Sequence, residues 1–171
     1  AVGLIRSVDT NTVIAGNLAL KQSALVSSDR GTETALIWME TTMNANDQSL
    51  DSNRLSDGYF ATFDVNGDGL IDANDDARAL VDGSGIVETA NDGLGNTVSY
   101  VIQRMCMQAA PASDTNVCMY GDNVVGTGSK GVKPGPLGGA QINSKQSPMY
   151  RITVKVSGPK NTVSYTQTFV Y

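Results

Sequence analysis

The first 42 residues contain no proline, and this run constrains the fold more than any other feature of the chain. Five apolar residues in it fall within about 60° of one another at 100° per residue, namely Ile14, Leu18, Leu25, Leu36 and Met39. The pattern predicts one helix over about residues 2–41, about 60 Å long at 1.5 Å per residue. A helix of that length must either brace a sheet or project from the domain. Gly16 and Gly31 are predicted weak points, each costing ~1 kcal/mol against alanine.

The end of the chain carries the clearest strand pattern. Apolar residues alternate with polar ones in residues 150–156 and again in residues 163–171, around a turn-forming cluster at residues 157–161. This predicts a β-hairpin, and a similar alternation predicts a further strand over residues 96–105. A helix followed by a sheet is an α+β architecture. The chain 1–171 is therefore expected to be one domain in which the long helix packs on an antiparallel β-sheet.

Residues 43–95 connect the predicted helix and sheet, and they contain the pattern of a calcium loop at residues 64–75. Positions 1, 3, 5, 7, 9 and 12 of the loop place oxygen ligands on Asp64, Asn66, Asp68, Leu70 (backbone carbonyl), Asp72 and Asp75. Several carboxylates at this spacing suit a hard cation that takes 6–8 oxygens, so we predict one calcium ion. The loop resembles those of EF-hands and dockerins, although Asp75 stands where EF-hands have glutamate.

Calcium is expected to act as a structural staple of this connection rather than as a switch. A short helix is also predicted over about residues 74–81, starting at the end of the loop. The alternative interpretation of residues 64–75 is a solvated turn rich in aspartate, asparagine and glycine.

The composition argues against several function classes. The chain has no histidine, which removes the usual general base and the usual zinc ligand. Carboxylates at calcium-loop spacing are better explained as ligands than as an acid–base pair, so we expect no enzymatic activity. The net charge of −5 gives no electrostatic footprint for nucleic acid. Cys106 and Cys118 are expected to form a disulfide, which is typical of an oxidising compartment, and two unrelated buried thiols are the alternative.

Residues 119–147 hold seven glycines and two prolines, which predicts an irregular segment. A connection of this length without secondary structure is unusual in a compact domain. We therefore expect this segment to carry contacts with partners.

Three parts of the chain resemble PilX-type minor pilins of bacterial type IV pili. Residues 6–20 (RSVDTNTVIAGNLAL), 21–25 (KQSAL) and 29–31 (DRG) are similar to the region after the membrane-spanning half of the first helix in that family. Residues 150–154 (YRITV) and 158–162 (GPKNT) are similar to its last hairpin, and Cys106 and Cys118 fit a disulfide-closed loop after its first strand. Together the likeness covers roughly residues 5–40, 96–120 and 148–171.

The resemblance implies a type IV pilin-like fold and a role in pilus assembly. Members of the family carry a hydrophobic N-terminal helix half, absent from this chain, that anchors them at the periplasmic face of the inner membrane. They then enter the extracellular fibre. Their partners are other minor pilins, the major pilin and a tip adhesin of the PilY family. They help to start polymerisation and support adhesion, aggregation and twitching motility. The calcium loop is not a general feature of the family.

Two other classes remain open from the sequence. A pseudopilin of a type II secretion system would share the plan of a helix and a sheet. A calcium-dependent extracellular binding module would need an aromatic platform. Trp38 lies near the predicted helix end and is expected in the core, and Tyr120 is a weaker candidate.

Overall fold

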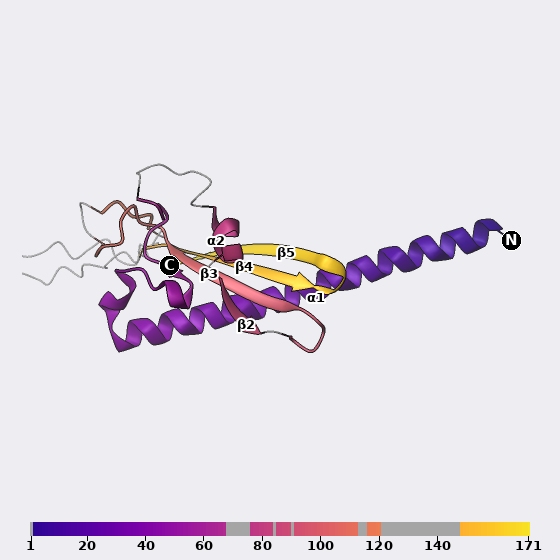
Figure 1. Ribbon diagram of the computed structural model, residues 1–171, viewed down its shortest axis with the longest axis horizontal. Helices are drawn as coiled ribbons and strands as arrows, with labels where there is room; N and C mark the ends of the chain where they lie inside the picture. The colour runs from indigo at the N-terminus through magenta and orange to yellow at the C-terminus, as the bar shows by residue number, and fades with distance from the viewer. Residues whose placement is uncertain (1, 68–75, 84, 90, 113–115, 121–147) are drawn as a thin grey trace, which may run out of the picture.

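A computed structural model describes residues 2–67, 76–83, 85–89, 91–112, 116–120 and 148–171, with the backbone alone for residues 2–10 and Asp47 (Figure 1). The elements are helices α1 (Val2–Ala45) and α2 (Ala77–Gly83) and strands β1 (Tyr59–Phe60), β2 (Ile86–Thr89), β3 (Thr97–Arg104), β4 (Tyr150–Gly158) and β5 (Thr162–Val170). Short 3-10 helices cover Asp47–Leu50, Leu55–Asp57 and Pro159–Asn161. The long helix packs on the sheet, so the α+β prediction is confirmed.

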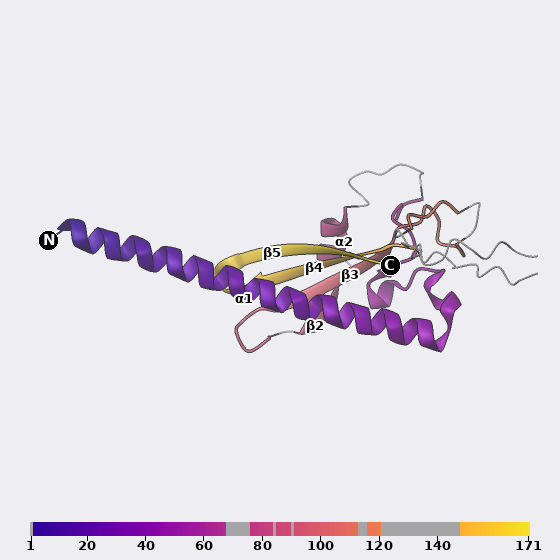
Figure 2. The same ribbon diagram turned by 180° about the vertical axis from the view of Figure 1, so that it is seen from behind.

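Helix α1 has 44 residues and would span about 66 Å. It runs past the predicted end near residue 41, because the first residue that redirects the chain is Asn46, whose side chain accepts a hydrogen bond from the Gln48 amide and caps the next 3-10 helix. The N-terminal part of α1 projects beyond the sheet (Figures 1 and 2), and residues 11–19 are all exposed.

The strands described form one sheet in the order β1-β3-β4-β5, with β2 also paired to β3. The predicted antiparallel pairing holds for β2–β3, β3–β4 and β4–β5, but the sheet is mixed, because β1 pairs with β3 in parallel, Tyr59 opposite Ile102 and Phe60 opposite Gln103. Gly58, in the left-handed region at φ +66°, allows the turn before β1, and the Ile102 amide donates to its carbonyl. Two residues are too few to show an alternating pattern in the sequence.

The predicted hairpin is confirmed. Strands β4 and β5 pair in register from Tyr150 opposite Val170 to Gly158 opposite Thr162. The turn at residues 159–161 places Lys160 and Asn161 at φ +57°, a conformation that asparagine tolerates better than most residues. The predicted strand at residues 96–105 is also confirmed, as β3, which pairs with β4 along its whole length.

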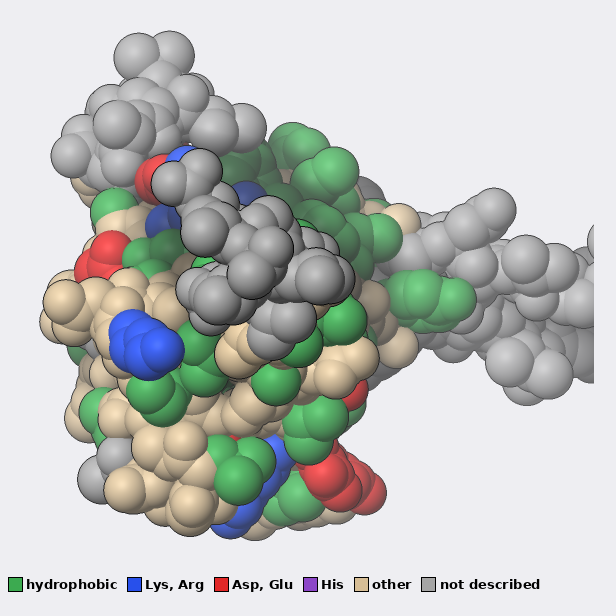
Figure 3. Space-filling view, turned by 90° about the vertical axis from the view of Figure 1, so that its right-hand side faces the viewer, with side chains coloured by type: hydrophobic (Ala, Val, Ile, Leu, Met, Phe, Trp, Pro, Cys, Tyr) green, Lys and Arg blue, Asp and Glu red, His purple; other side chains and the backbone are tan. Residues whose placement is uncertain are grey.

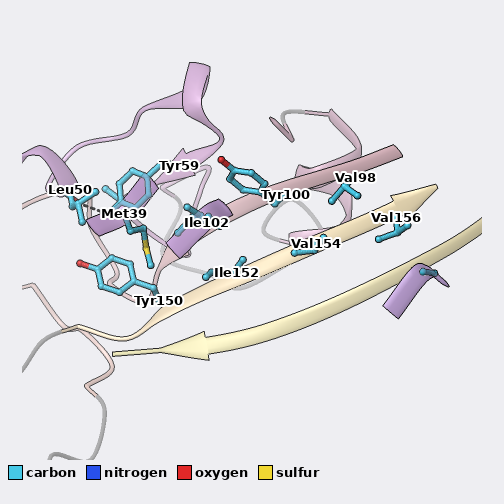
Figure 4. Close-up of a cluster of buried hydrophobic side chains, with 13 residues drawn as sticks. Met39, Leu50, Tyr59, Val98, Tyr100, Ile102, Tyr150, Ile152, Val154 and Val156 are labelled. Atoms are coloured by element: carbon cyan, nitrogen blue, oxygen red, sulfur yellow. Dashed lines mark hydrogen bonds between the residues drawn. The ribbon is translucent and has the colours of Figure 1, made fainter. Parts of the chain in front are cut away.

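Small residues make up the face of α1 that lies on the sheet. Its buried positions are Ala24, Ser27, Ser28, Gly31, Ala35, Met39 and Thr42. The sheet meets them with large side chains, among them the fully buried Val98, Ile102 and Val154 (Figure 4). A Cβ at Gly31 would lie 2.7 Å from Cγ1 of Val98 and 2.8 Å from Cγ1 of Val154. Gly31 is therefore required by the close approach of helix and sheet.

The predicted apolar stripe of α1 is not the face that packs on the sheet. Met39 is buried, whereas Ile14, Leu18, Leu25 and Leu36 are 38–59% exposed. The physical reason is space, since a sheet face already filled with valine, isoleucine and tyrosine side chains accommodates a helix most closely through small residues. The larger apolar side chains of α1 consequently remain outside.

Helix α2 covers the opposite face of the sheet. Its Val81 packs with Phe60 and Val101 in a second apolar cluster. Asp82 fixes α2 further, because its carboxylate pairs with Lys155 Nζ at 2.6 Å and accepts a hydrogen bond from the Tyr165 hydroxyl at 3.1 Å. These bonds lower the pKa of Asp82, the Lys155 bond most of all, and raise that of Lys155. The predicted helix at residues 74–81 begins later, at Ala77, and residues 74 and 75 lie outside the described residues.

Candidate functional site

Five of the eight large exposed apolar side chains described on α1 form a line along the helix, here called the outer stripe, while Val13, Val26 and Ile37 lie on other sides of the helix. The outer stripe consists of Ile14, Leu18, Leu25, Leu36 and Met43, which fall within about 40° of one another at 100° per residue. The stripe spans about 44 Å of helix, and polar residues such as Asp29 and Thr32 interrupt it. Figure 3 looks along the molecule from the side of the N-terminus and shows hydrophobic side chains at the surface of the described part among polar ones. The stripe therefore consists of large apolar side chains that are aligned on one side of α1 but separated by polar positions.

A buried polar cluster, here called the polar clamp, holds α1 where it leaves the sheet. Asn96, 1% exposed, donates from Nδ2 to the hydroxyls of Ser23 and Ser27 at 2.8 and 3.1 Å and to Asp92 Oδ2 at 2.8 Å. Ser27 in turn donates to Asp92 at 2.5 Å. The hydrogen bond from Ser27, followed by those from Asn96 and from the Leu94 amide, holds the pKa of Asp92 well below its ordinary value. The clamp joins α1 to the loop between β2 and β3.

The start of the predicted calcium loop is folded against the domain. Asp64 is 4% exposed, and its Oδ1 accepts a hydrogen bond from the Gly67 amide at 2.8 Å, which turns the chain back over the carboxylate. Asn66 follows on this turn and, with Asp64, borders a pocket of about 390 Å³. The other predicted ligands, Asp68, Leu70, Asp72 and Asp75, lie outside the described residues. Within the described part of the chain, no three acidic or cysteine side chains converge as a metal site.

The predicted disulfide is confirmed, and it lies beside this loop. Cys106 and Cys118 are bonded, with an S–S distance of 2.03 Å. The Thr62 hydroxyl is within hydrogen-bond distance of the Cys106 carbonyl, at 2.9 Å, and accepts from the Asp64 amide at 3.1 Å. The Phe63 amide also donates to the Cys106 carbonyl. The disulfide loop therefore positions the first residue of the predicted calcium loop, a link that the sequence did not reveal.

Sequence reasoning missed Arg104, which is 2% exposed at the end of β3. Its Nη1 pairs with Asp51 Oδ1 at 2.7 Å, Nε donates to the Ala61 carbonyl at 3.2 Å, and Nη2 donates to the Ala110 carbonyl. One guanidinium thus ties together the connection after α1 and the disulfide loop. The period of two was a usable signal, since Arg104 continues the series of Val98, Tyr100 and Ile102 on the helix-facing side.

The aromatic residues support a structural role for Trp38. Its ring lies 5.5 Å from that of Tyr59 and packs against the main core, as predicted. Burial raises the pKa of Tyr59, whose hydroxyl donates to the Leu50 carbonyl at 2.7 Å. Tyr120 is partly exposed, and the segment 121–147, in which we expected partner contacts, lies outside the described residues.

No helix within the described residues has both the length and the apolar character needed to cross a membrane. Comparisons of the chain with protein-family models, with curated proteins and with solved structures each found no match.

Proposed function

We propose that this chain is the exported part of a type IV minor pilin of the PilX kind, a structural subunit that helps to start pilus assembly at the tip and supports adhesion and twitching motility. The observation that carries the proposal is the outer stripe on a helix that projects past its own sheet. Such a surface is stabilised most by packing against other helices. The resemblance of residues 6–20 and of the β4–β5 hairpin to that family suggests the kind of assembly.

In this proposal the partners are other minor pilins, the major pilin and a PilY-family adhesin. A hydrophobic helix half preceding Ala1 in the full-length protein would hold the subunit at the periplasmic face of the inner membrane before assembly. The coding sequence upstream of Ala1 tests this directly. A leader that ends in glycine, followed by phenylalanine and about twenty apolar residues, is expected. An ordinary cleavable export signal with no apolar segment after it would contradict the proposal.

The assembly role is tested by Leu18→Glu in the native bacterium, with Asn17→Glu as the matched control. Both positions are exposed at the same level of α1, but only Leu18 belongs to the outer stripe. Burying an unpaired carboxylate costs more than the ~1.4 kcal/mol that a tenfold effect requires, so L18E should reduce the pili recovered by shearing about tenfold or more. Equal recovery of pili from both variants would refute the role. Normal pili with impaired type II secretion would instead indicate a pseudopilin.

We further propose that residues 64–75 bind one calcium ion that fastens the helix-to-sheet connection. Two observations support a staple. The carboxylate of Asp64 is buried beside the disulfide loop, and Ala77, just after the loop, is 1% exposed in α2. The loop thus lies between two buried residues of the domain, Asp64 and Ala77. It carries four aspartates, Asp64, Asp68, Asp72 and Asp75, whose charges would repel without a cation. Bound calcium would neutralise this charge through oxygen ligands.

Calcium removal gives a direct test. At a hundred times its dissociation constant, calcium should add about 2.7 kcal/mol, which for a domain of this size is about 5–11 °C in Tm. We expect EDTA to lower the Tm of the wild-type protein by that amount. It should leave the Tm of the Asp64→Ala variant unchanged, because the variant has lost a calcium ligand. Asp29→Ala, at an exposed acid on α1, should respond to EDTA as the wild type does. A wild-type Tm that neither calcium nor EDTA shifts would exclude the site.

A further inference from the structure

Strand β5 is the last strand at one edge of the sheet. Within the described residues it pairs with β4 alone, over the nine residues Thr162–Val170. Half of the backbone donors and acceptors of such a strand point away from the sheet. Figure 1 shows β5 as the outermost strand on its side of the sheet.

The opposite edge is built differently. It consists of β1, with two residues, and β2, with four residues and a register shift between Val87 and Thr89. Glu88 of β2 is also paired with Arg30 at 3.1 Å. Shortness, irregularity and charge are the features by which proteins prevent strands from pairing at an edge. Strand β5 has none of them, because it is regular and contains no charged residue and no proline.

The side chains of β5 complement those of an antiparallel copy of the same strand. In a register centred on Thr166, Val163 lies opposite Phe169 of the second copy, and Tyr165 lies opposite Gln167 of the second copy. Val163 and Phe169 share one face of the strand and are 53% and 52% exposed. A β-branched residue opposite an aromatic one is a favourable cross-strand pair, and the symmetry makes this pair twice.

We propose that two copies of this chain associate through antiparallel β5–β5 pairing centred on Thr166, which joins their sheets into one. The pairing uses only the sheet edge and does not rest on the pilin proposal. A twofold axis through Thr166 would point the two α1 helices in opposite directions, so the pair would join subunits of opposite polarity. The contact is smaller than a standard protein interface, so the dimer is expected to form at high protein concentration.

Analytical ultracentrifugation of the purified domain, from about 10 µM to about 1 mM, tests the association. The double variant V163K/F169K places lysine opposite lysine at both pairs and should weaken dimerisation at least tenfold. The matched variant V163K/F169E places each lysine opposite a glutamate and should restore dimerisation. Phe169 lies opposite Arg151 of β4, so F169K should lower the Tm more than F169E does, and a cooperative unfolding transition of each variant checks that both remain folded. A wild-type monomer at every concentration, or equal dimerisation of both variants, would overturn the proposal.

Cysteine cross-linking tests the register separately. A mixture of V163C and F169C should form a mixed disulfide dimer under mild oxidation, because the two positions face each other across the pair. V163C alone should not cross-link to itself, because its two thiols would be about 20 Å apart, six residues along the strand at about 3.3 Å each. Cross-linking of V163C alone at the rate of the mixture would show that the register is wrong.

Discussion

Replacing Gly31 with alanine should destabilise the domain, although alanine is the better helix former. Helix propensity alone predicts a gain of ~1 kcal/mol. The new methyl group, however, would lie 2.7 Å from Val98 and 2.8 Å from Val154, which are both fully buried. Forcing an extra methyl group into a filled core costs about 1–3 kcal/mol. The net expectation is a loss of up to about 2 kcal/mol, or up to about 8 °C in Tm at 2–4 °C per kcal/mol.

Thermal unfolding followed by circular dichroism at 222 nm, with the disulfide intact, measures this change. Gly16→Ala is the matched control, because no atom lies within 4 Å of a Cβ built there. It should leave Tm unchanged or raise it. A double-mutant cycle with Val154→Ala should show favourable coupling of about 0.5 kcal/mol or more, because the shortened side chain makes room for the methyl group. A rise of Tm in G31A by the amount that propensity demands would refute the close helix–sheet contact.

Two further predictions concern polar side chains. Arg104→Met should lower the free energy of unfolding by about 3–5 kcal/mol, because it leaves Asp51 and the Ala61 carbonyl without the partner that they have in Arg104. Arg78→Met, at an exposed position of α2, should change the free energy of unfolding by about 1 kcal/mol or less, and equal effects of the two substitutions in denaturant titration would contradict the role of Arg104. Asp92 has a folded-state pKa depressed below its ordinary 3.8, so it stabilises the domain above about pH 4 and loses this contribution as the pH falls. Asp92→Asn should therefore flatten the decline of Tm on acidification, and a decline as steep as that of the wild type would contradict this contribution.

The regular elements were predictable because their signals are local. Alternation identifies both β4 and β5, although their pairing closes around a turn of three residues and not the five that the turn-forming cluster suggested. A proline-free run identifies α1, although the helix continues past the predicted end near residue 41 to Ala45. Strand β1 could not be predicted, because its two residues owe their conformation to pairing with β3 and not to any pattern of their own.

The face of α1 that packs on the sheet could not be predicted from the sequence, for a different reason. Hydrophobic periodicity identifies where large apolar side chains gather, but the sheet selects for size as well as polarity. Alanine, serine and glycine at the buried positions carry little hydrophobic signal, whereas Leu18 and Leu25 carry much and remain exposed. Likewise, the order of ligands in residues 64–75 can be read from spacing, but the support of Asp64 by Thr62 and the disulfide loop depends on contacts between distant segments.

Helix α1 packs on the sheet along about half of its length, and its N-terminal part projects from the domain. Among the contacts described, the polar clamp lies at the point where α1 begins to project past the sheet, so a sideways force on the projecting part would act on Asn96 and its serine partners before the valine and isoleucine side chains behind them. Hydrogen bonds between small polar groups are lost at smaller displacements than the contacts of an apolar interface are. The contact between α1 and the loop before β3 would therefore be lost under such a force before the contact between α1 and the sheet.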